Sequence, residues 1–553
     1  MKRNEQELID ELKKRYEALK NQRQKYESIW QTLSELVLPR IADITFDGTR
    51  TDSVSYKVEG AYDSTGRSAL RLAVDGTYGH LTPRTSTFFK LAPVRRAYGK
   101  LSPRGKKALQ EAEYAVLDEL QRSNFYDSMT PVYEHGFSIG TSPMHIMEDV
   151  QRKTIVYTPK HPKAYYAAEN AYGIVDTIFE SQWMTWRQVA QQFGAEKLTL
   201  AMQQSLKDTP YEEVEVLRCV TPRSDRDPKK KDNLNMPYRV VWMFADEDVI
   251  LRESGYQFMH DIFWRFRAMQ GDVYGTSPAW DAYLDLKRAD KFAETLLRAA
   301  DLAVRPPVQG PGKLLRSDQL RPAGMIPTHD GLGKIEPINL VGNYPIGKDQ
   351  TEALEHAIRQ HFMVDYYMML YQTAERQRTA YETAQLAGEK AAVMQAMVGR
   401  IESELLDPTL QATVAIMSEA GRFPDMPDEL LDPEAGGGLK FDYISPLAEM
   451  QRQHHGRQTV ANLIADIMPI LQINPQAADN INWDGLLRNT AEDSYLDVLL
   501  DERMVAQIRE ARAQQQAAMN QVATVKEMSE AAENLKEPGA QQAFGALQQM
   551  GGR

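Results

Sequence analysis

The feature of this sequence that most restricts its fold is a pair of long helical segments separated by a stretch that cannot be helical. A helical pattern of apolar and charged residues runs from residue 277 to about 304, which predicts a helix roughly 40 Å long. Pro306 and Pro307 end it, and glycine and proline are frequent from there to residue 347. Helical spacing resumes at about residue 348 and continues to 371. We therefore expect two long helices on either side of a compact insert of short strands and turns.

The rest of the chain mixes helices with short strands. Helical spacing and capping residues predict helices over residues 5–36, 64–79, 102–123 and 185–193. Runs rich in β-branched and aromatic residues predict strands at 154–157, 214–220 and 238–242. A further helix is expected over 379–420, kinked at Pro408 and ended by Gly421, with more helices over 447–522. The last 30 residues, rich in Gln, Ala and Gly, are expected to be disordered, and the fold class is α+β, mainly α.

The charge balance argues against a protein that grips nucleic acid tightly. Lys and Arg number 65 against 77 Asp and Glu, a net charge of −12, whereas tight binding to phosphate usually needs a basic surface. An acidic wall would still let DNA slide past, because it repels phosphate.

The single cysteine and the charged N-terminus bear on the cellular compartment in which the protein folds. Cys219 lies in a predicted strand, so we expect a buried, inert thiol, no internal disulfide and a reducing environment such as a cytoplasm. The charged N-terminus predicts neither a signal peptide nor a transit peptide. The most apolar helical run, 362–370, is far shorter than the roughly 20 residues of a membrane span, so we expect a soluble protein.

Two short motifs resemble catalytic signatures and fail on context. The run 342–349, GNYPIGKD, has the glycine and lysine spacing of a phosphate-binding loop, but Asp349 stands where Ser or Thr must hold magnesium. The run 136–140, GFSIG, fits a hydrolase nucleophile motif but lacks a preceding buried strand. We interpret the first as a turn before a helix and the second as a glycine-flanked turn.

Neither the histidines nor the basic loop predicts a metal or phosphate site. His356 and His361 are five residues apart, off the spacing that places two metal ligands on one helix face, and His454 and His455 have no carboxylate partner nearby. The run 223–233, RSDRDPKKKDN, could touch phosphate, although a solvated loop is the simpler interpretation. We expect no metal, no cofactor and no catalytic residue.

Short motifs are spread in a fixed order over about residues 25–515. They are Tyr62-Asp63-Ser64-Thr65, Leu81-Thr82-Pro83, Phe88-Phe89-Lys90-Leu91, Ser123-Asn124-Phe125-Tyr126, Gly136 with Gly140-Thr141, Tyr274-Gly275-Thr276-Ser277-Pro278, Pro306-Pro307, Arg378-Thr379-Ala380-Tyr381-Glu382-Thr383 and Gly421-Arg422-Phe423-Pro424. Through their order and spacing, more than through any one of them, the chain resembles the head-to-tail connecting family of short-tailed, T7-like bacteriophages, that is, portal proteins.

The resemblance implies a portal fold that assembles as a ring, with named regions along the chain. It implies a wing at 1–276, a first stem helix at 277–304, a clip at 305–347 and a second stem helix at 348–371. It implies a tunnel loop at 372–379, a long kinked wing helix at 380–450 and crown helices at 451–523. The tail at 524–553 matches no part of the family, and its composition alone predicts disorder.

The resemblance also implies partners and site residues. It implies a homo-oligomeric ring, typically a dodecamer, at a capsid vertex of the virion, assembled in the host cytoplasm. The partners would be the terminase large subunit, tail adaptor or nozzle proteins, major capsid and scaffolding proteins, internal core proteins, and double-stranded DNA in the channel without sequence specificity. No membrane is implied. The implied site residues are Gln372, Glu375, Arg376, Gln377 and Arg378 in the tunnel loop, Lys287, Arg288, Lys291 and Glu294 on the stem channel wall, and Lys313, Arg316, Arg321 and Lys334 on the clip.

Two other functions stay open on the sequence alone. A tail adaptor or an internal virion core protein can also be helical and rich in glutamine. A packaging ATPase or nuclease is a weaker alternative, because the phosphate-loop motif lacks its Ser or Thr and no acidic metal cluster accompanies it.

Overall fold

The computed structural model describes residues 5–45, 61–94, 101–227, 229–230, 232–269, 271–306, 308–311, 325–328, 336–337, 344–367, 394–427, 430 and 438–444. All of them belong to one unit, Met1–Gln451. A second unit, Arg452–Arg553, lies outside the described residues, together with the predicted crown helices and C-terminal tail. The described part combines helices with small sheets, which confirms the predicted α+β class.

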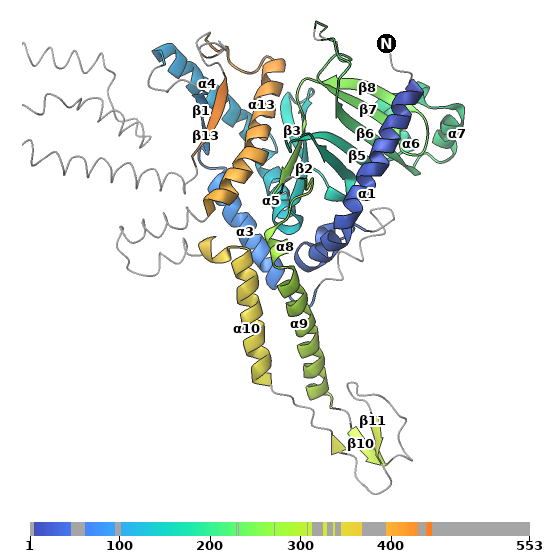
Figure 1. Cartoon of the computed structure of the whole chain (residues 1–553), viewed down its shortest axis with the longest axis vertical. Helices are drawn as coiled ribbons and strands as arrows, with labels where there is room; N and C mark the ends of the chain where they lie inside the picture. Colours follow the sequence, from blue (N-terminus) through green and yellow to red (C-terminus); the bar gives the residue numbers. More distant parts are fainter. Residues whose placement is uncertain are drawn as a thin grey trace, which may run out of the picture. The chain divides into compact units, whose positions relative to one another are not determined.

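The N-terminal helix α1 (Glu5–Val37) packs on two different surfaces along its length (Figure 1). Its first half buries Leu8, Leu12, Tyr16 and Leu19, at helical spacing, against a five-stranded sheet. Its second half inserts Trp30 and its neighbours into the main core. A short 3-10 turn, η1 (Pro39–Ile41), follows where proline stops the helix.

The five-stranded sheet is an antiparallel meander in sequence order. Its strands are β4 (Tyr165–Glu169), β5 (Val175–Thr185), β6 (Glu213–Pro222), β7 (Tyr238–Phe244) and β8 (Ile250–Tyr256). Alternation along β6 places Leu217 and Cys219 under α1. Val216 faces the other side, which α6 (Trp186–Phe193), η4 (Ala195–Lys197) and α7 (Leu200–Asp208) cover.

Cys219 is fully buried, in agreement with the sequence pattern. Burial raises the pKa of its thiol far above the usual range, so very little thiolate forms near neutral pH. The buried thiol is therefore inert in the folded chain.

The main core lies between helices and a three-stranded antiparallel sheet of order β3-β2-β9. The strands are β2 (Thr141–Asp149), β3 (Thr154–Pro159) and β9 (Asp261–Arg265), and the 3-10 turn η3 (Pro162–Ala164) leads from β3 to β4. The surrounding helices are α3 (Thr65–Leu81), α4 (Pro103–Arg122), α5 (Phe125–Ile139), the π-helical turn η5 (Glu402–Leu406) and α13 (Asp407–Glu419).

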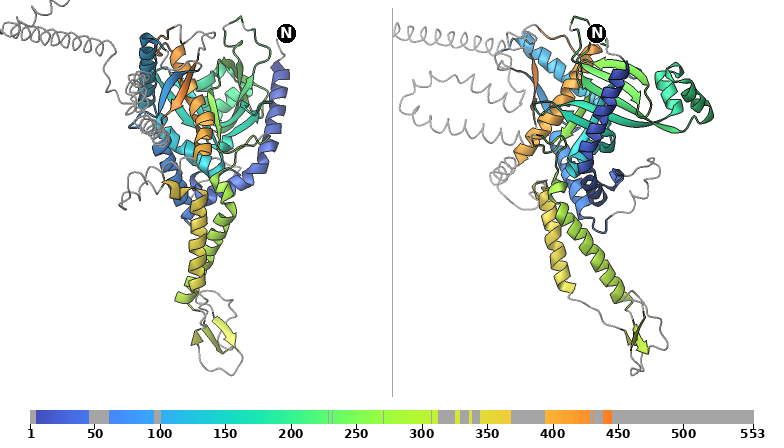
Figure 2. Two further views of the ribbon diagram at one scale, coloured as in Figure 1. Left: turned by 60° about the vertical axis from the view of Figure 1, so that its left-hand side comes forward. Right: turned by 45° about the vertical axis from the view of Figure 1, so that its right-hand side comes forward.

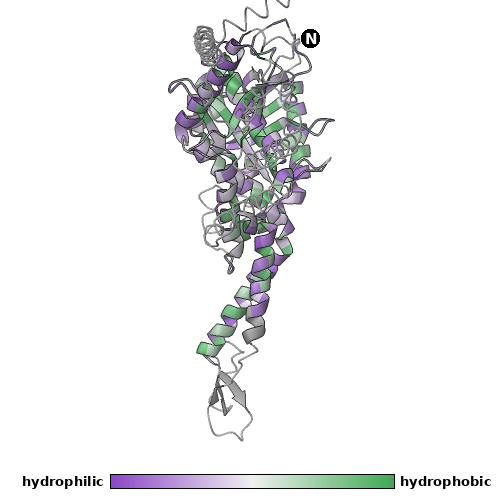
Figure 3. Ribbon diagram, turned by 90° about the vertical axis from the view of Figure 1, so that its left-hand side faces the viewer, coloured by the Kyte–Doolittle hydropathy of each residue, from purple (hydrophilic) through white to green (hydrophobic). Residues whose placement is uncertain are grey.

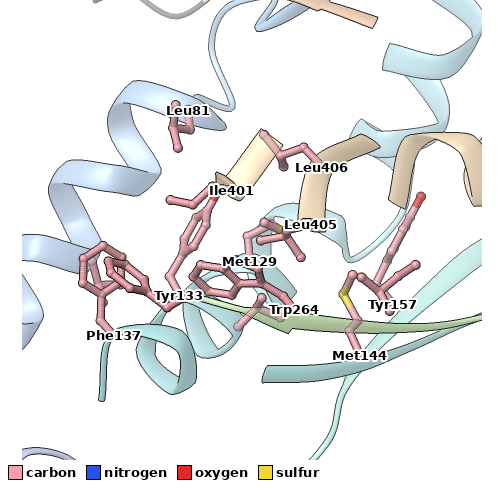
Figure 4. Packing of buried hydrophobic residues seen from close by; sticks show 14 of the residues in the cluster. Leu81, Met129, Tyr133, Phe137, Met144, Tyr157, Trp264, Ile401, Leu405 and Leu406 are labelled. Carbon is pink, nitrogen blue, oxygen red and sulfur yellow. The ribbon is translucent and has the colours of Figure 1, made fainter. Parts of the chain in front are cut away.

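Figure 4 shows how Trp264 of β9 packs into this core. Its indole lies edge-on to Tyr133 of α5, with ring centroids 6.0 Å apart, and Met129 and Leu405 pack nearby. A side chain at Gly136 would collide with this indole, so glycine at that position makes room for the largest core residue.

Gly140 joins α5 to β2 at a point where two backbones meet. Its φ of 87° is left-handed, and it is the C-cap of α5. A Cβ there would also collide with the carbonyl of Gly275. Two of the motifs that carry the family resemblance, Gly140-Thr141 and Tyr274-Gly275, are therefore in contact.

A two-stranded antiparallel sheet joins distant parts of the chain. β1 (Phe89–Pro93) pairs with β13 (Leu439–Tyr443), and Phe89 packs edge-on to Phe441 at 5.6 Å.

Two antiparallel helices leave the main core side by side, with a small sheet between them in the chain (Figures 1 and 2). The first, α9 (Tyr283–Val304), follows the one-turn helix α8 (Pro278–Asp281), and the second is α10 (Tyr344–His361). Between them, β10 (Val308–Pro311) pairs in parallel with β11 (Met325–Thr328) and antiparallel with β12 (Glu336–Pro337). Figure 3 shows both hydrophilic and hydrophobic residues along the helix pair, and Leu284, Leu297 and Val304 of α9 are apolar residues that are exposed.

Most predicted elements are present, and several boundaries were wrong. The expected helix at 277–304 breaks at Ala282, and the second long helix begins at Tyr344 rather than 348 and ends at His361 rather than 371. The run 136–140 is not a glycine-flanked turn, because its first four residues end α5. The expected kink at Pro408 takes the form of a π-helical turn directly before it, and Gly421 does follow α13 in a left-handed conformation, with φ 65°.

Candidate functional site

The helix pair α9 and α10 holds the predicted site residues that the structure describes. Ser277 begins this region: its hydroxyl accepts a hydrogen bond from the Trp280 amide at 3.0 Å and donates one to the Ser138 carbonyl at 2.8 Å. The start of the pair is therefore fixed to the C-terminal turn of α5. Beyond it, α9 buries only Leu286 and Ala289, both in its first two turns.

Carboxylate side chains of α8 and α9 make ion pairs and hydrogen bonds with other segments of the unit. Asp281 lies 2.8 Å from Arg267, and Asp285 lies 3.4 Å from His361 at the end of α10. One oxygen of Asp290 accepts hydrogen bonds from the amides of Tyr62, at 2.6 Å, and Asp63, at 3.3 Å. Three acidic residues are thus engaged in holding the base of the helix pair.

The four predicted channel-wall residues all lie on α9. Lys291 donates to Glu294 at 2.7 Å, and Arg298 bonds the same carboxylate, which lowers the pKa of Glu294. The side chains of Lys291 and Arg298 are each 72% exposed, whereas that of Glu294 is 15% exposed. Lys287 and Arg288 are exposed as well; Lys287 lies 5.3 Å from the ring of Tyr283, and Arg288 lies 3.7 Å from Asp285.

The remaining predicted site residues lie outside the described residues. These are the tunnel-loop residues Gln372, Glu375, Arg376, Gln377 and Arg378 and the clip residues Lys313, Arg316, Arg321 and Lys334. Of the three predicted groups of site residues, the described part of the chain therefore contains one, the stem channel wall.

Of the two motifs that resemble catalytic signatures, residues 136–139 lie in α5 and residues 344–349 lie in α10. Ser138 is buried in α5, and its hydroxyl donates to the Glu134 carbonyl at 2.6 Å, so it is not presented as a nucleophile. In the motif with phosphate-loop spacing, residues 344–349 lie in α10, whereas a phosphate loop must be open to expose its amides.

The described ranges lack two further kinds of site. In them, no group of three or more His, Cys, Asp or Glu side chains is arranged to hold a metal ion. Within the same ranges, every helix is too short or too polar to cross a bilayer.

A buried charge cluster that the sequence analysis did not predict joins the two larger sheets. Arg218 of β6 donates to Glu180 of β5 at 2.7 Å, to Asp261 of β9 at 2.8 Å and to the Tyr165 hydroxyl at 3.0 Å. Lys160 also bonds Glu180 at 2.7 Å, and His145 lies 3.0 Å from Asp261. The sequence does carry one signal for the cluster, because Arg218 is a charged residue inside an apolar strand, VLRCV.

The pKa values in this cluster follow from its pairing. Burial alone would raise the pKa of Asp261, but Arg218 and then His145 outweigh burial and hold that pKa well below its usual value. The same balance, through Arg218 and Lys160, lowers the pKa of Glu180. Both carboxylates therefore stay ionised although they are buried.

Arg422, in the last family motif, binds residues from three earlier segments of the chain. It bonds Glu119 of α4 at 2.7 Å, Glu148 of β2 at 3.1 Å and the carbonyl of Lys153 at 2.8 Å. The chain after α13 is thus tied to the three-stranded sheet.

Comparison with known proteins identifies the family. The model of the family described as bacteriophage head to tail connecting protein matches residues 9–494. The "Portal protein" of Salmonella phage epsilon15 is 29% identical over 545 residues, which cover 96% of this chain and 95% of that protein. The "Probable portal protein" of Bordetella phage BPP-1 is 27% identical over 533 residues, 94% of each chain. The match points to a structural rather than an enzymatic role, and the chain belongs to the bacteriophage head to tail connecting protein family.

Proposed function

We propose that this chain is a portal subunit whose copies form a ring around a DNA channel at one vertex of the phage capsid. The observation that carries the proposal is the antiparallel pair α9 and α10 with a small sheet between them, because a paired stem with a distal domain suits a channel that projects from a head. The names of the two relatives support the same function. A closed ring needs a heterologous contact between copies, and a dodecamer is the number that the family resemblance implies.

The proposed regions follow the chain order predicted from the sequence. The wing comprises 1–276 and 380–450, the stem is α9 with α10, the tunnel loop lies at 372–379, and the crown covers 451–523. The clip predicted at 305–347 ends at residue 343 in this proposal, because the second stem helix begins at Tyr344.

The DNA contacts in this proposal are to phosphate and not to bases. Arg376 and Arg378 of the tunnel loop, in the company of Gln372, Glu375 and Gln377, would place a ring of guanidinium groups at a constriction, and arginine binds phosphate with two parallel hydrogen bonds. Such contacts carry no sequence preference. On the stem, Lys287, Arg288, Lys291 and Glu294 are the predicted channel wall, and their mixed charges would limit firm binding.

The clip would exchange partners on one polar surface. Lys313, Arg316, Arg321 and Lys334 are the residues proposed to bind the terminase large subunit during packaging and a tail adaptor or nozzle protein afterwards. The wing and crown would contact the major capsid, scaffolding and internal core proteins. The ring would be assembled in the host cytoplasm and perform no catalysis of its own.

Single-particle electron microscopy of the purified full-length chain, with its mass in solution, tests this proposal. A ring of about twelve copies with an axial hole is the expected result. A chain that stays monomeric at micromolar concentration would contradict the portal assignment, and binding to tail proteins or ATP hydrolysis would then decide among the alternative functions.

A further inference from the structure

The α9–α10 pair carries opposite charges on its two outer sides. The contact between Asp285 and His361, at 3.4 Å, marks the side on which each helix faces the other. Because an α-helix turns by about 100° per residue, the positions of all other side chains around each helix can be related to that contact.

Three exposed cations of α9 lie on the side facing away from α10. By residue spacing, Lys287, Lys291 and Arg298 lie about 120–160° around the helix from Asp285. Glu294 lies beside them, about 180° from Asp285, and bonds Lys291 and Arg298. We call these four residues the basic flank; its three cations exceed its one carboxylate, so its net charge is positive.

Three carboxylates of α10, two exposed and one half-buried, lie on the side facing away from α9. Asp349, Glu352 and Glu355 lie about 120–180° around the helix from His361. Arg359 lies on the same side and bonds Glu355 at 3.3 Å. We call these four residues the acidic flank, and its net charge is negative by the same margin.

The two flanks also lie at the same height along the pair. The helices are antiparallel, and Lys291 lies six residues beyond Asp285 while Glu355 lies six residues before His361. Both are therefore about 9 Å along the axis from the base contact. Counted from the same two residues, Glu294 and Glu352 are each nine residues away and so lie at one height. Arg298, at thirteen residues, lies close to the height of Asp349, at twelve.

We propose that the basic flank of one copy binds the acidic flank of the next copy. Rotation about an axis along the helix pair preserves height, so Lys291 and Arg298 of one copy meet Glu355, Glu352 and Asp349 of its neighbour. The contact is heterologous, because the two surfaces differ, and therefore it propagates around a ring. This inference rests on the proposed function, since it needs a ring whose axis follows the helix pair.

Charge complementarity favours a second copy over DNA as the occupant of the basic flank. DNA would match the basic flank but would repel the acidic flank, which lies at equal height and is negatively charged, whereas a second copy matches both. The contact would remove Lys287, Lys291 and Glu294 from the predicted channel wall. Arg288 points about 60° away from Lys291 around the helix and is not part of the flank.

Charge reversal on the full-length chain tests the contact. Lys291→Glu with Arg298→Glu, or Glu352→Lys with Glu355→Lys, should each raise the concentration needed for ring assembly about tenfold or more, because like charges then face each other. All four substitutions in one chain should restore assembly, since the flanks are again complementary. The matched control is Lys107→Glu with Arg122→Glu on α4, where both cations are exposed and each has an acidic partner four residues away.

The outcomes separate three ideas. If wild-type chains do not assemble, the proposed function fails. If wild-type chains form rings and each reversed pair assembles equally well, the flank contact is wrong. Normal rings of the Lys291→Glu, Arg298→Glu variant with less packaged DNA would assign the basic flank to DNA instead. Unchanged thermal unfolding and restored assembly of the fourfold variant exclude misfolding as the cause.

Cross-linking gives an independent readout of the same contact. Lys291→Cys and Glu355→Cys in one chain place two thiols at equal height on opposite sides of the pair, and the native Cys219 is buried. A short bis-maleimide should then link neighbouring copies into a ladder of oligomers. Assembled rings that yield only monomers after treatment would overturn the proposal.

Discussion

At the scale of single residues, Arg218 neutralises two buried carboxylates in the described unit. It reaches carboxylates from two different sheets, Glu180 at 2.7 Å and Asp261 at 2.8 Å, and all three side chains are almost completely buried. A buried ion pair is costly to form, and losing one partner leaves the other charge without compensation. The geometry explains why a charged residue is tolerated in a central strand.

Arg218→Met should destabilise the chain by about 3–5 kcal/mol, because Glu180 and Asp261 would stay buried without their main partner. Denaturant unfolding of the full-length chain measures this change. Arg187→Met, on the exposed side of α6, is the control and should cost less than about 1 kcal/mol. Equal stability of the two variants would show that the cluster contributes little.

The tunnel-loop arginines make a second prediction at this scale. If Arg376 and Arg378 hold packaged DNA through phosphate, Arg376→Gln with Arg378→Gln should cause genome leakage or incomplete packaging. The DNA content of purified particles is the measurement, and Arg122→Gln with Arg187→Gln removes the same charge elsewhere as a control. Full heads that retain their genome would reject this role.

At the scale of elements, the junction between α5 and β2 depends on Gly140 in two ways. Its φ of 87° disfavours any other residue, and a Cβ would collide with the Gly275 carbonyl. Gly271 offers a comparison, because its φ of 93° is similar but a Cβ there would have no described atom within 4 Å beyond its chain neighbours.

Gly271→Ala should therefore cost about 1 kcal/mol from backbone conformation alone, and Gly140→Ala at least about 3 kcal/mol, since backbone must also move. Thermal unfolding of both variants isolates the steric part as the difference. A difference close to zero would mean that the junction relaxes without penalty.

The clip is a second element whose role can be separated from folding. Replacing residues 305–343 by a short Gly-Ser linker should leave unfolding of the rest of the chain nearly unchanged, because the linker only reconnects two antiparallel helices. Docking of the tail adaptor should be lost. Pull-down of adaptor by purified rings is the measurement, and retained binding would move the docking surface elsewhere.

The sequence predicts elements well where one periodicity continues and poorly where a residue type has two interpretations. The stripe of Leu8, Leu12, Tyr16 and Leu19 predicts α1 within one residue of each end. Pro345 suggests a loop, yet proline is tolerated in the first turn of a helix, and α10 begins at Tyr344. The break predicted at Asn124 is present, because α4 ends at Arg122 and Asn124 is the N-cap of α5.

At the scale of the whole molecule, the contacts that build the core join distant segments, and local patterns carry no information about them. The pairing of β1 with β13 and the bonds of Arg422 to Glu119 and Glu148 are examples. Of the four predicted channel-wall residues on α9, Lys287, Arg288 and Lys291 are exposed, whereas Glu294 is largely covered. The sequence does not predict that Asp285 and Asp290 turn inward, because their partners, His361 and the amides of residues 62 and 63, come from elsewhere in the chain.

Acid stability is a property of the whole unit, because the Arg218 cluster joins its two larger sheets. The pKa of Asp261 is held well below its usual value, so its stabilising contribution is complete above about pH 4 and is lost as the pH falls further. In Arg218→Met, burial would instead raise that pKa, and protonation would then favour the folded state. The stability difference between the wild type and this variant should therefore shrink between pH 7 and pH 4 in denaturant titrations; a constant difference would contradict it.

Cys219 is buried between α1 and the five-stranded sheet. Its thiol can therefore be used to detect local opening of this part of the fold. A reagent can reach the thiol only when α1 lifts from the sheet or the sheet itself parts. The rate of native-state thiol labelling therefore measures the free energy of that opening, in the way that amide exchange does for a backbone site. Comparing free chains with assembled ones would then reveal how strongly neighbours hold the N-terminal helix in place.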